Sequence, residues 1–272
     1  MFSTRRLKMS NGFLWFAQNN DSTDYVDLSI KLAESIKKHN RQNKICVVTD
    51  KKSKFENKNV DVVKVLAEDH SHEHKIKWAN EYKAFTLSPF THTIKVEADM
   101  LWTINTDWWW YHLWQHDLVF SVDCLNYRDQ VVKNTPYRKL FSRNNLPNIY
   151  NGLMYFRRSQ YAKKFFDTAK AIVENWKEVK TKILIACHDE YPSTDVVYAL
   201  AYKILDPTNS RLIDFDWFKF IHHKPSVNGL SHIKDQDNYL YTNMNNASYF
   251  LGDRKVSRVW HYNKKDIHVR TP

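Results

Sequence analysis

The feature that most constrains the fold is an alternation of short apolar runs and helical stretches over the first hundred residues. The apolar runs predict strands at 13–17, 44–49, 60–66 and 93–96. Apolar residues recur at helical spacing after the first run, and a second helix is predicted at about 76–87. Strands that alternate with helices in this way form a mostly parallel α/β sheet with helices on both faces.

The ends of the predicted elements carry further signals. Asp21 or Ser22 can cap the first helix, because a short polar side chain accepts hydrogen bonds from the exposed amides of a helix start. The second half of the chain is less regular. It predicts strands at 118–122 and 149–156, helices capped by Ser159 and Thr194, and a short strand or loop at 256–262.

Polar side chains gather where the predicted strands end. In open α/β sheets, ligands bind beyond the carboxyl ends of the strands. Residues far apart in sequence can therefore converge on one crevice. The residues at these ends are Ala17, Gln18, Asn19, Asp50, Glu97 and Asp99.

Glu97 and Asp99 follow the apolar run Thr93–Val96 directly and are two residues apart. Alternation along a strand turns both carboxylates to the same side. Two acids at the end of a buried strand are costly unless a cation meets them. A divalent metal that carries a diphosphate is one such cation, since hard cations take oxygen ligands. The alternative is an acidic, solvated strand end.

Glycine is scarce, and this excludes two kinds of nucleotide site. The chain has only Gly12, Gly152, Gly229 and Gly252. It therefore contains neither a glycine-rich dinucleotide loop nor a phosphate loop of the Gly-Lys-Ser/Thr type. A nucleotide would have to be held in another way, and a metal on side-chain carboxylates is the most direct one.

Basic residues exceed acidic ones by 41 to 30, for a net charge of +11. A positive field favours polyanions, nucleic acid first. The alternative is a lysine-rich, solvated surface. The excess is partly clustered, at Lys51, Lys52 and Lys54; Arg157, Arg158, Lys163 and Lys164; Arg254, Lys255 and Arg258; and Lys264 and Lys265.

The composition indicates a single soluble, intracellular protein. No Ser/Gly-rich or Pro-rich linker divides the chain. The apolar run 13–17 is too short for a signal peptide core or a membrane span. Cys46, Cys124 and Cys187 are odd in number and far apart, which predicts reduced core residues and not a disulfide framework or a zinc site.

Several motifs stand in an order that belongs to a known family. The segment Ile94–Leu101 resembles a strand that ends in Asp-x-Asp followed by Met and an apolar residue, although Glu97 replaces the first Asp. With the motifs described next, the chain resembles a nucleotide-sugar glycosyltransferase of the GT-A fold, nearest in pattern to family 8. The resemblance covers about residues 12–262 as an order of elements.

The resemblance implies a fold and a division of labour. The fold would be α/β and GT-A-like: a mostly parallel, Rossmann-like sheet flanked by helices, with a smaller acceptor-side sheet. Residues 1–272 would form one catalytic domain. About 12–105 would bind the nucleotide sugar, and about 106–272 would bind the acceptor.

The resemblance also implies site residues. Lys83, within Glu81–Phe85, stands where the family carries a lysine that faces the donor. Asn151 and Gly152 stand at the start of a strand that lines the acceptor side. His261 matches a carboxyl-terminal His-Tyr whose histidine is a third metal ligand beside Glu97 and Asp99. The Gly and Lys-Pro-Trp that follow in the family are absent, and Asn263-Lys264-Lys265 stands there.

Further roles follow from the same resemblance. One of Asp189, Glu190 and Asp195 would be the catalytic acid that faces the sugar. Lys224 and Lys83 would add positive charge near the diphosphate. The cofactor would be a divalent ion, Mn²⁺ or Mg²⁺, which stabilises the leaving nucleotide. The proposed donor-binding set is Ala17, Gln18, Asn19, Asp50, Lys83, Glu97 and Lys224.

Each of these residues also has a plainer interpretation. Lys83 can be a solvated helix residue, Asn151-Gly152 a turn, and Asp195 an acid favoured by a helix start. His261 can be a hydrogen-bonded, partly buried histidine. His222-His223-Lys224-Pro225 can be a loop or can supply a ligand or a phosphate contact. Trp108–Trp114 can be a packed helix start or can offer a stacking ring.

The acceptor is open on the motifs alone. The charge and the many aromatic residues favour DNA, and the chain looks similar to bacteriophage enzymes that glycosylate hydroxymethylated cytosines. Such an enzyme would flip the base out of the duplex and would work in the host cytoplasm. One alternative is a transferase that builds a bacterial surface polysaccharide. Another is a non-catalytic nucleic-acid-binding protein with a degenerate GT-A fold. No protein partner is indicated.

Overall fold

The structure is a computed structural model that describes residues 10–71, 76–133, 138–228, 240–243, 248–251 and 254–262. Some features of the sequence lie outside these ranges. They are the charged amino end, Gly229, Gly252 and the segment 263–265 with its two lysines. Everything below concerns the described residues.

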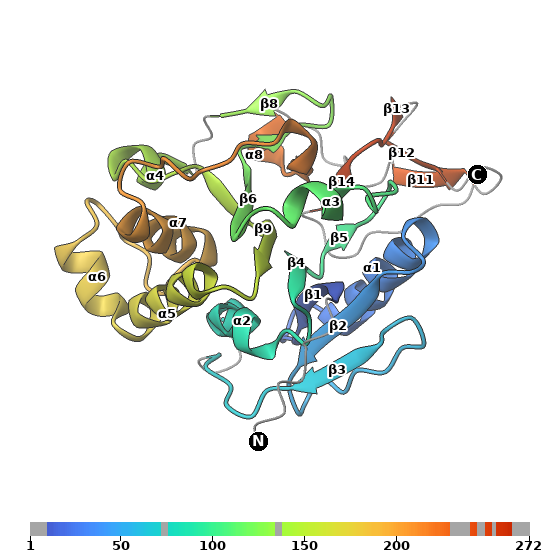
Figure 1. The fold of residues 1–272 in the computed structure, drawn as a ribbon, viewed down its shortest axis with the longest axis horizontal. Helices are drawn as coiled ribbons and strands as arrows, with labels where there is room; N and C mark the ends of the chain where they lie inside the picture. Colours follow the sequence, from blue (N-terminus) through green and yellow to red (C-terminus); the bar gives the residue numbers. More distant parts are fainter. Residues whose placement is uncertain are drawn as a thin grey trace, which may run out of the picture.

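The large sheet has the strand order β3-β2-β1-β4-β9-β6 (Figure 1). β1 to β4 run parallel, and β9 is antiparallel to both β4 and β6. The strand at the centre, β4, therefore joins the parallel half to the antiparallel half. The bounds are β1 Asn11–Ala17, β2 Lys44–Thr49, β3 Val62–Val65, β4 His92–Val96, β6 Leu118–Val122 and β9 Ile149–Arg157.

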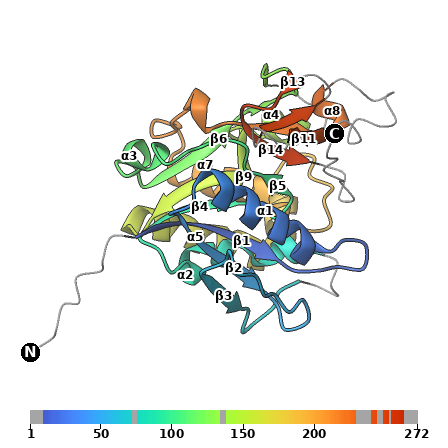
Figure 2. The same ribbon diagram turned by 90° about the vertical axis from the view of Figure 1, so that its right-hand side faces the viewer.

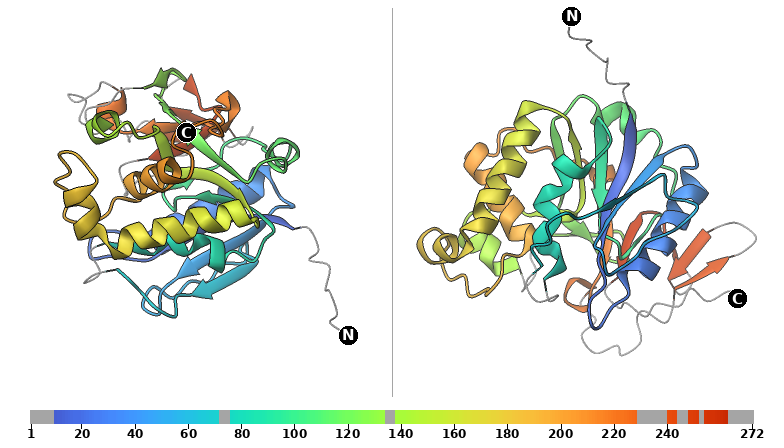
Figure 3. Two further views of the ribbon diagram at one scale, coloured as in Figure 1. Left: turned by 60° about the vertical axis from the view of Figure 1, so that its left-hand side comes forward. Right: turned by 90° about the horizontal axis from the view of Figure 1, so that it is seen from below.

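Helices cover both faces of this sheet, and the strands bury alternate residues against each (Figures 2 and 3). In β1, Leu14 packs on the side of α5 and α7, whereas Phe13 and Trp15 pack on the side of α1. Both faces are apolar, as expected for a largely parallel sheet. The bounds are α1 Tyr25–His39, α2 Ala84–Leu87, α3 Trp109–Leu113, α5 Gln160–Glu174 and α7 Thr194–Leu205.

A second sheet lies beside the end of β4 and has the order β5-β14-β10-β7-β8. It gathers short strands from distant parts of the chain, so it closes the fold around the carboxyl end of the large sheet. A three-stranded sheet of β11, β12 and β13 lies in the same part of the molecule (Figure 1). The bounds are β5 Met100–Leu101, β7 Cys124–Leu125, β8 Val131–Val132, β10 Phe220–His223, β11 Leu240–Asn243, β12 Ser248–Leu251, β13 Arg254–Lys255 and β14 Val259–Tyr262.

The remaining elements are short. Trp109 and Trp110 of α3 are buried, which confirms a packed helix in the Trp-rich segment. The 3-10 helix η2, Lys77–Lys83, leads directly into α2. The other elements are α4 Lys139–Arg143, α6 Trp176–Lys182, η4 Asp216–Phe218 and α8 Pro225–Asn228.

The predicted α/β class, with a mostly parallel sheet flanked by helices and a smaller second sheet, is confirmed. All three cysteines are free thiols, as predicted. Cys46 and Cys124 are buried, and Cys187 is half-buried. None of the helices in the described ranges is long and apolar enough to cross a membrane.

Two local predictions, both of helix caps, were wrong. Asp24, not Asp21 or Ser22, caps α1, because Asn20 accepts hydrogen bonds from Ser22 and prolongs the turn. Thr194 is the first residue of α7 and not its cap. The helix predicted at about 76–87 is present, and its first part, Lys77–Lys83, is a 3-10 helix that runs into α2.

Candidate functional site

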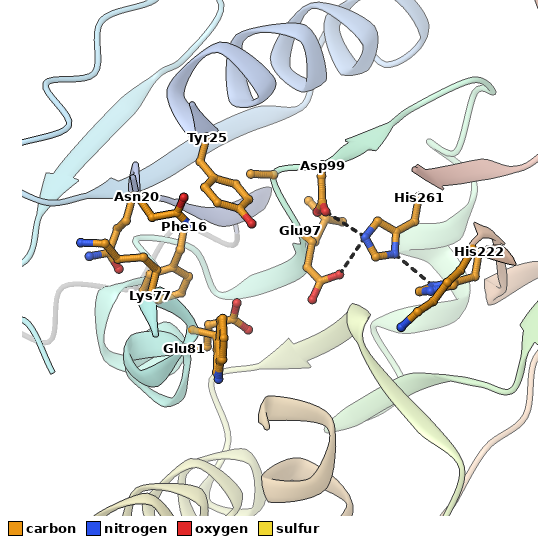
Figure 4. A pocket seen from close by; sticks show the side chains of 14 residues that line it. Phe16, Asn20, Tyr25, Lys77, Glu81, Glu97, Asp99, His222 and His261 are labelled. Carbon is orange, nitrogen blue, oxygen red and sulfur yellow. Dashed lines mark hydrogen bonds and ion pairs between the residues drawn. The ribbon is translucent and has the colours of Figure 1, made fainter. Parts of the chain in front are cut away.

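Glu97, Asp99 and His261 lie together because the two sheets meet there (Figure 4). Glu97 follows the last residue of β4, and Asp99 precedes β5. β5 pairs antiparallel with β14, which sets His261 opposite Met100. The amide of Tyr262 also donates to the carbonyl of Asp99 at 3.2 Å. A short strand pair thus brings residues more than 160 positions apart to one point.

The geometry of these side chains suits one metal ion. His261 Nε2 lies 3.1 Å from Asp99 Oδ2 and 3.4 Å from Glu97 Oε2. One ligand atom from each residue lies within 4.8 Å of the others. Ligands that share one Mg²⁺ ion at about 2.1 Å are at most about 4.2 Å apart, so small side-chain movements would suffice. Carboxylates and a neutral imidazole are ligands suited to Mn²⁺ and Mg²⁺ as well as to other divalent ions.

A second histidine stands behind the first. β10 pairs parallel with β14 and sets His222 beside His261, with 3.1 Å between their Nδ1 atoms. One of these nitrogens must carry a hydrogen atom and donate a hydrogen bond to the other. Burial lowers the pKa of both imidazoles, in His222 well below the usual value. Both rings are therefore neutral near pH 7, and His261 keeps Nε2 for an ion while His222 fixes its orientation.

Asn151 and Gly152, at the start of β9, contact Glu97. Asn151 Nδ2 donates to Glu97 Oε1 at 2.8 Å. A Cβ atom on Gly152 would stand 2.9 Å from Glu97 Oε2 and 3.1 Å from Met100 Cε, so any other residue would make the Glu97 carboxylate shift. Burial raises the pKa of Glu97, as do the charges of Glu81 and Asp195, against the lowering by His261 and Lys95.

A separate polar cluster surrounds Gln18 on the other side of the crevice. We call it the Gln18 cluster: Gln18, Asp50, Asp69, Lys77 and Asn80. Gln18 donates to both Asp50 and Asp69 at 3.2 Å. Lys77 lies 3.3 Å from Asp50, and Asn80 donates to Asp69 at 2.7 Å.

Burial alone would raise the pKa of both acids in this cluster. Hydrogen bonds from Ser53, Gln18 and Lys77 outweigh burial and hold the pKa of Asp50 below its ordinary value. In Asp69, donors from Ser71 and Asn80 and the charge of Lys77 lower the pKa to about 2. Both carboxylates are therefore charged and well supplied with donors.

Gln18 and Lys77 of the Gln18 cluster line one pocket of about 220 Å³ together with Glu97, Asp99 and His261 (Figure 4). Of the predicted site residues, Gln18, Glu97, Asp99, Lys224 and His261 line it. Residues that were not predicted complete the wall. They are Phe16, Asn20, Tyr25, Lys77, Trp78, Glu81, Val96 and Ala98, together with His222, for which the sequence left a ligand role open.

The other predicted donor residues stand behind the wall or away from it. Asp50 supports Gln18 and Lys77. Asn19 accepts from the amide of Val26 near the start of α1, and the Ala17 carbonyl accepts from Thr49. Lys83 is outside the pocket: its Nζ donates to the Glu68 carbonyl at 2.6 Å, and Lys77 lines the pocket instead.

The three candidate catalytic acids are not equivalent. Asp195, at the start of α7, accepts from the Asn151 amide at 2.7 Å and pairs with Arg138 at 2.7 Å. Asn151 therefore connects Asp195 to Glu97. Asp189 lines a different hollow, which Asp195 also borders, and Glu190 lines a third. Neither is brought to the pocket that contains Glu97.

Signals for the missed residues were present in the sequence. Lys77 and Glu81 are four positions apart, so a helical turn places them on one face, and both line the pocket. Lys95 interrupts the apolar strand β4, and it is fully buried. A lysine at such a position demands a partner, and the partner is Glu81 at 2.6 Å.

Comparison with known proteins gives a limited likeness. The galactosyltransferase LgtC, solved in complex with donor and acceptor sugar analogs, is 13% identical over 70% of this chain and 70% of that chain, with a TM-score of 0.46. A structure of an active-site mutant of LgtC is 12% identical over 70% of this chain and 69% of that chain, with a TM-score of 0.45. No protein-family model and no curated protein matches the sequence. A likeness of this degree carries no argument about the reaction, which must be argued from the residues themselves.

Proposed function

We propose that this protein is a metal-dependent glycosyltransferase that moves a sugar from a nucleotide donor, UDP first among the candidates, to a hydroxyl acceptor. The observation that carries the proposal is the cluster of Glu97, Asp99 and His261 in a pocket that also contains Lys77 and Lys224. Carboxylates that face one another in a partly buried pocket beside lysines suit a cation bound to an anionic ligand.

The residues divide the work of the transfer. A divalent ion held by Glu97, Asp99 and His261 would supply charge to the diphosphate as the leaving group departs. Lys224 lines the same pocket, and the charges of Glu97 and Asp195 act on it. Its ammonium group would balance the second phosphate. The bond from the anomeric carbon to the diphosphate oxygen breaks, and a bond to the acceptor oxygen forms.

From the same arrangement we assign donor binding to one half of the chain and acceptor binding to the other. Residues of about 12–105 supply Phe16, Gln18 and Tyr25, and we assign the nucleoside to this side, where an aromatic ring can stack on a base. Residues of about 106–272 would carry the acceptor. Asp195 borders the same hollow as Asp189, but we favour it as the acid for the acceptor proton, because it bonds to Asn151, which in turn bonds to Glu97.

DNA that contains 5-hydroxymethylcytosine is the proposed acceptor. The net charge of +11 supports this choice, because neutralising phosphates dominates binding to nucleic acid. The enzyme would then act on phage DNA in the host cytoplasm, adding a hexose or a pentose. Binding that hardly changes with salt would contradict the DNA acceptor.

Mass spectrometry of nucleosides tests reaction and acceptor together. DNA with 5-hydroxymethylcytosine is incubated with the protein, Mn²⁺ and a pool of UDP-sugars, then digested. The expected result is a mass gain of one pentose or hexose on the modified cytosine, present with Asp167→Asn and absent with Asp99→Asn. Asp167 is an exposed acid on α5 and serves as the matched control. Donor binding without any mass gain would reject this acceptor but keep the transferase, and a surface polysaccharide precursor would be tried next.

A further inference from the structure

One charged residue at the centre of the fold has no part in the reaction outlined above. Lys95 lies in the middle of β4, the strand that joins the two halves of the large sheet. Its side chain is 0% exposed, and its neighbours Ile94 and Val96 are buried too. A buried ammonium group is expensive unless it is paired and hydrogen-bonded. Its partners therefore show what it does.

Two side chains, Glu81 and Asn151, contact the ammonium group. Lys95 Nζ lies 2.6 Å from Glu81 Oε2. It also donates to Asn151 Oδ1 and, at 3.3 Å, to the Asn151 carbonyl. The lysine thus donates two hydrogen bonds to Asn151, and the Glu81 carboxylate supplies the opposite charge. Lys95 thus ties η2, β4 and β9 together from inside the sheet.

The contact with Asn151 decides how this amide is oriented. Its Oδ1 faces Lys95, and its Nδ2 therefore faces Glu97, to which it donates at 2.8 Å. The reversed amide would set an oxygen against the Glu97 carboxylate and an NH₂ group against the ammonium. Both contacts would be repulsive, so Lys95 permits only one orientation.

We propose that Lys95 is a positioning residue of the metal centre, which holds Glu97 in its ligand geometry through Asn151. Outer partners of metal ligands orient the ligands in this way and affect the affinity for the ion. The inference rests on the proposed function, because it assumes that Glu97, Asp99 and His261 bind a divalent ion. In the competing explanation, Lys95 only neutralises the charge of Glu81 and has no effect on the metal centre.

Three variants separate the two explanations. Lys95→Met alone leaves Glu81 buried without its partner and can prevent folding. Lys95→Met with Glu81→Gln removes both charges and keeps the core neutral. Glu81→Gln alone keeps Lys95 and its bonds to Asn151. Lys164→Met, an exposed lysine on α5, controls for the loss of a lysine as such.

The measurement is Mn²⁺ affinity, followed by the electron paramagnetic resonance signal of free Mn²⁺ in the absence of any substrate. Lys95→Met/Glu81→Gln is expected to bind about tenfold more weakly than Glu81→Gln, the lower end of the range for outer partners. Lys164→Met is expected to bind like the wild type. In a background with Glu81→Gln and Asn151→Ala, Lys95→Met should change nothing further, because the connection to Glu97 is already broken.

The possible failures are distinct. Equal affinity of Lys95→Met/Glu81→Gln and Glu81→Gln, both folded by circular dichroism, would overturn the inference and leave Lys95 as a counter-charge. A full tenfold loss that persists in the Asn151→Ala background would overturn the route through Asn151. A wild-type protein that binds no Mn²⁺ would instead reject the proposed function, and the inference with it.

Discussion

The two polar clusters on either side of the pocket differ in how their carboxylates are stabilised. In the Gln18 cluster, Asp50 accepts from two backbone amides as well as from Gln18 and Lys77. The protein itself supplies the donors, and the pKa of each acid is lowered. In the cluster around His261, burial raises the pKa of Glu97, and the nearest imidazoles are neutral.

This contrast separates the acids that stabilise the fold from the acids that are available to a ligand. A carboxylate with several internal donors is already stabilised as an anion and gains little from an ion. A carboxylate whose pKa is raised by burial and by other acids gains most from a cation. Asp50 and Asp69 should therefore be needed for stability, and Glu97 and Asp99 for binding.

The largest expected effect is on metal binding by Asp99→Asn. Loss of a direct ligand should weaken Mn²⁺ binding by at least about 100-fold, the upper end of what outer partners alone cost. The free energy of unfolding of the metal-free protein should change by less than about 1 kcal/mol, a typical net hydrogen bond. Isothermal titration and urea unfolding measure the two quantities. A large loss of stability with unchanged Mn²⁺ binding would mean that Asp99 stabilises the fold and does not bind the ion.

Asp50→Asn should give the opposite pattern. An amide NH₂ group in place of one carboxylate oxygen would face the donors of Gln18 or Lys77. Because a buried pair is broken and donors are left unsatisfied, the free energy of unfolding should fall by about 2 to 3 kcal/mol. Mn²⁺ affinity of the folded protein should stay within about twofold of the wild type. Weaker Mn²⁺ binding with unchanged urea unfolding would mean that Asp50 belongs to the metal site.

Two glycines sharpen the comparison by steric means. Gly152→Ala places a methyl group 2.9 Å from Glu97 Oε2, at the end of a flexible side chain. Glu97 must shift, and Mn²⁺ affinity should fall by about tenfold. Gly12→Ala instead meets the Phe90 ring at 2.5 Å and should lower stability without changing Mn²⁺ affinity. We therefore expect Gly152→Ala to lower Mn²⁺ affinity and Gly12→Ala to lower stability, and not the reverse.

The smallest effect concerns pH. The folded pKa of Asp69 is about 2, below its unfolded value. Its contribution to stability is therefore complete above about pH 4 and is lost as the pH falls through about 2. Because the residue is exposed, solvent screening reduces this contribution to about 1 kcal/mol. The difference in unfolding free energy between wild type and Asp69→Asn should shrink by that amount between pH 5 and pH 2.

The large sheet could be predicted from the sequence because its signals are local. The strand Lys44–Thr49 was predicted at its observed bounds, since a buried parallel strand is a continuous apolar run. The pairing of Glu97 with Asp99 was predicted from strand alternation, but this reason was wrong, because β4 ends at Val96 and a turn brings the two acids together. The pairing of His261 with Met100 could not be derived from local signals, because it depends on two short strands from distant segments. It entered the prediction only through the family resemblance.

The missed and displaced residues show where local reasoning ends. Lys83 was expected at the donor, but the 3-10 geometry of η2 and its hydrogen bonds bring Lys77 there. The choice among three acids depends on the hydrogen bond of Asp195 to Asn151. Lys95 is the exception, because a lysine within a buried strand is itself a local signal of a buried, charged partner.

Anomalous diffraction at the manganese edge tests the central claim most directly. Crystals of the wild-type protein would be soaked with MnCl₂ and UDP. We expect one strong anomalous peak between Glu97, Asp99 and His261, with diphosphate oxygens completing the shell toward Lys224. No peak at this position, with UDP bound or absent, would contradict a metal centre formed by these three residues.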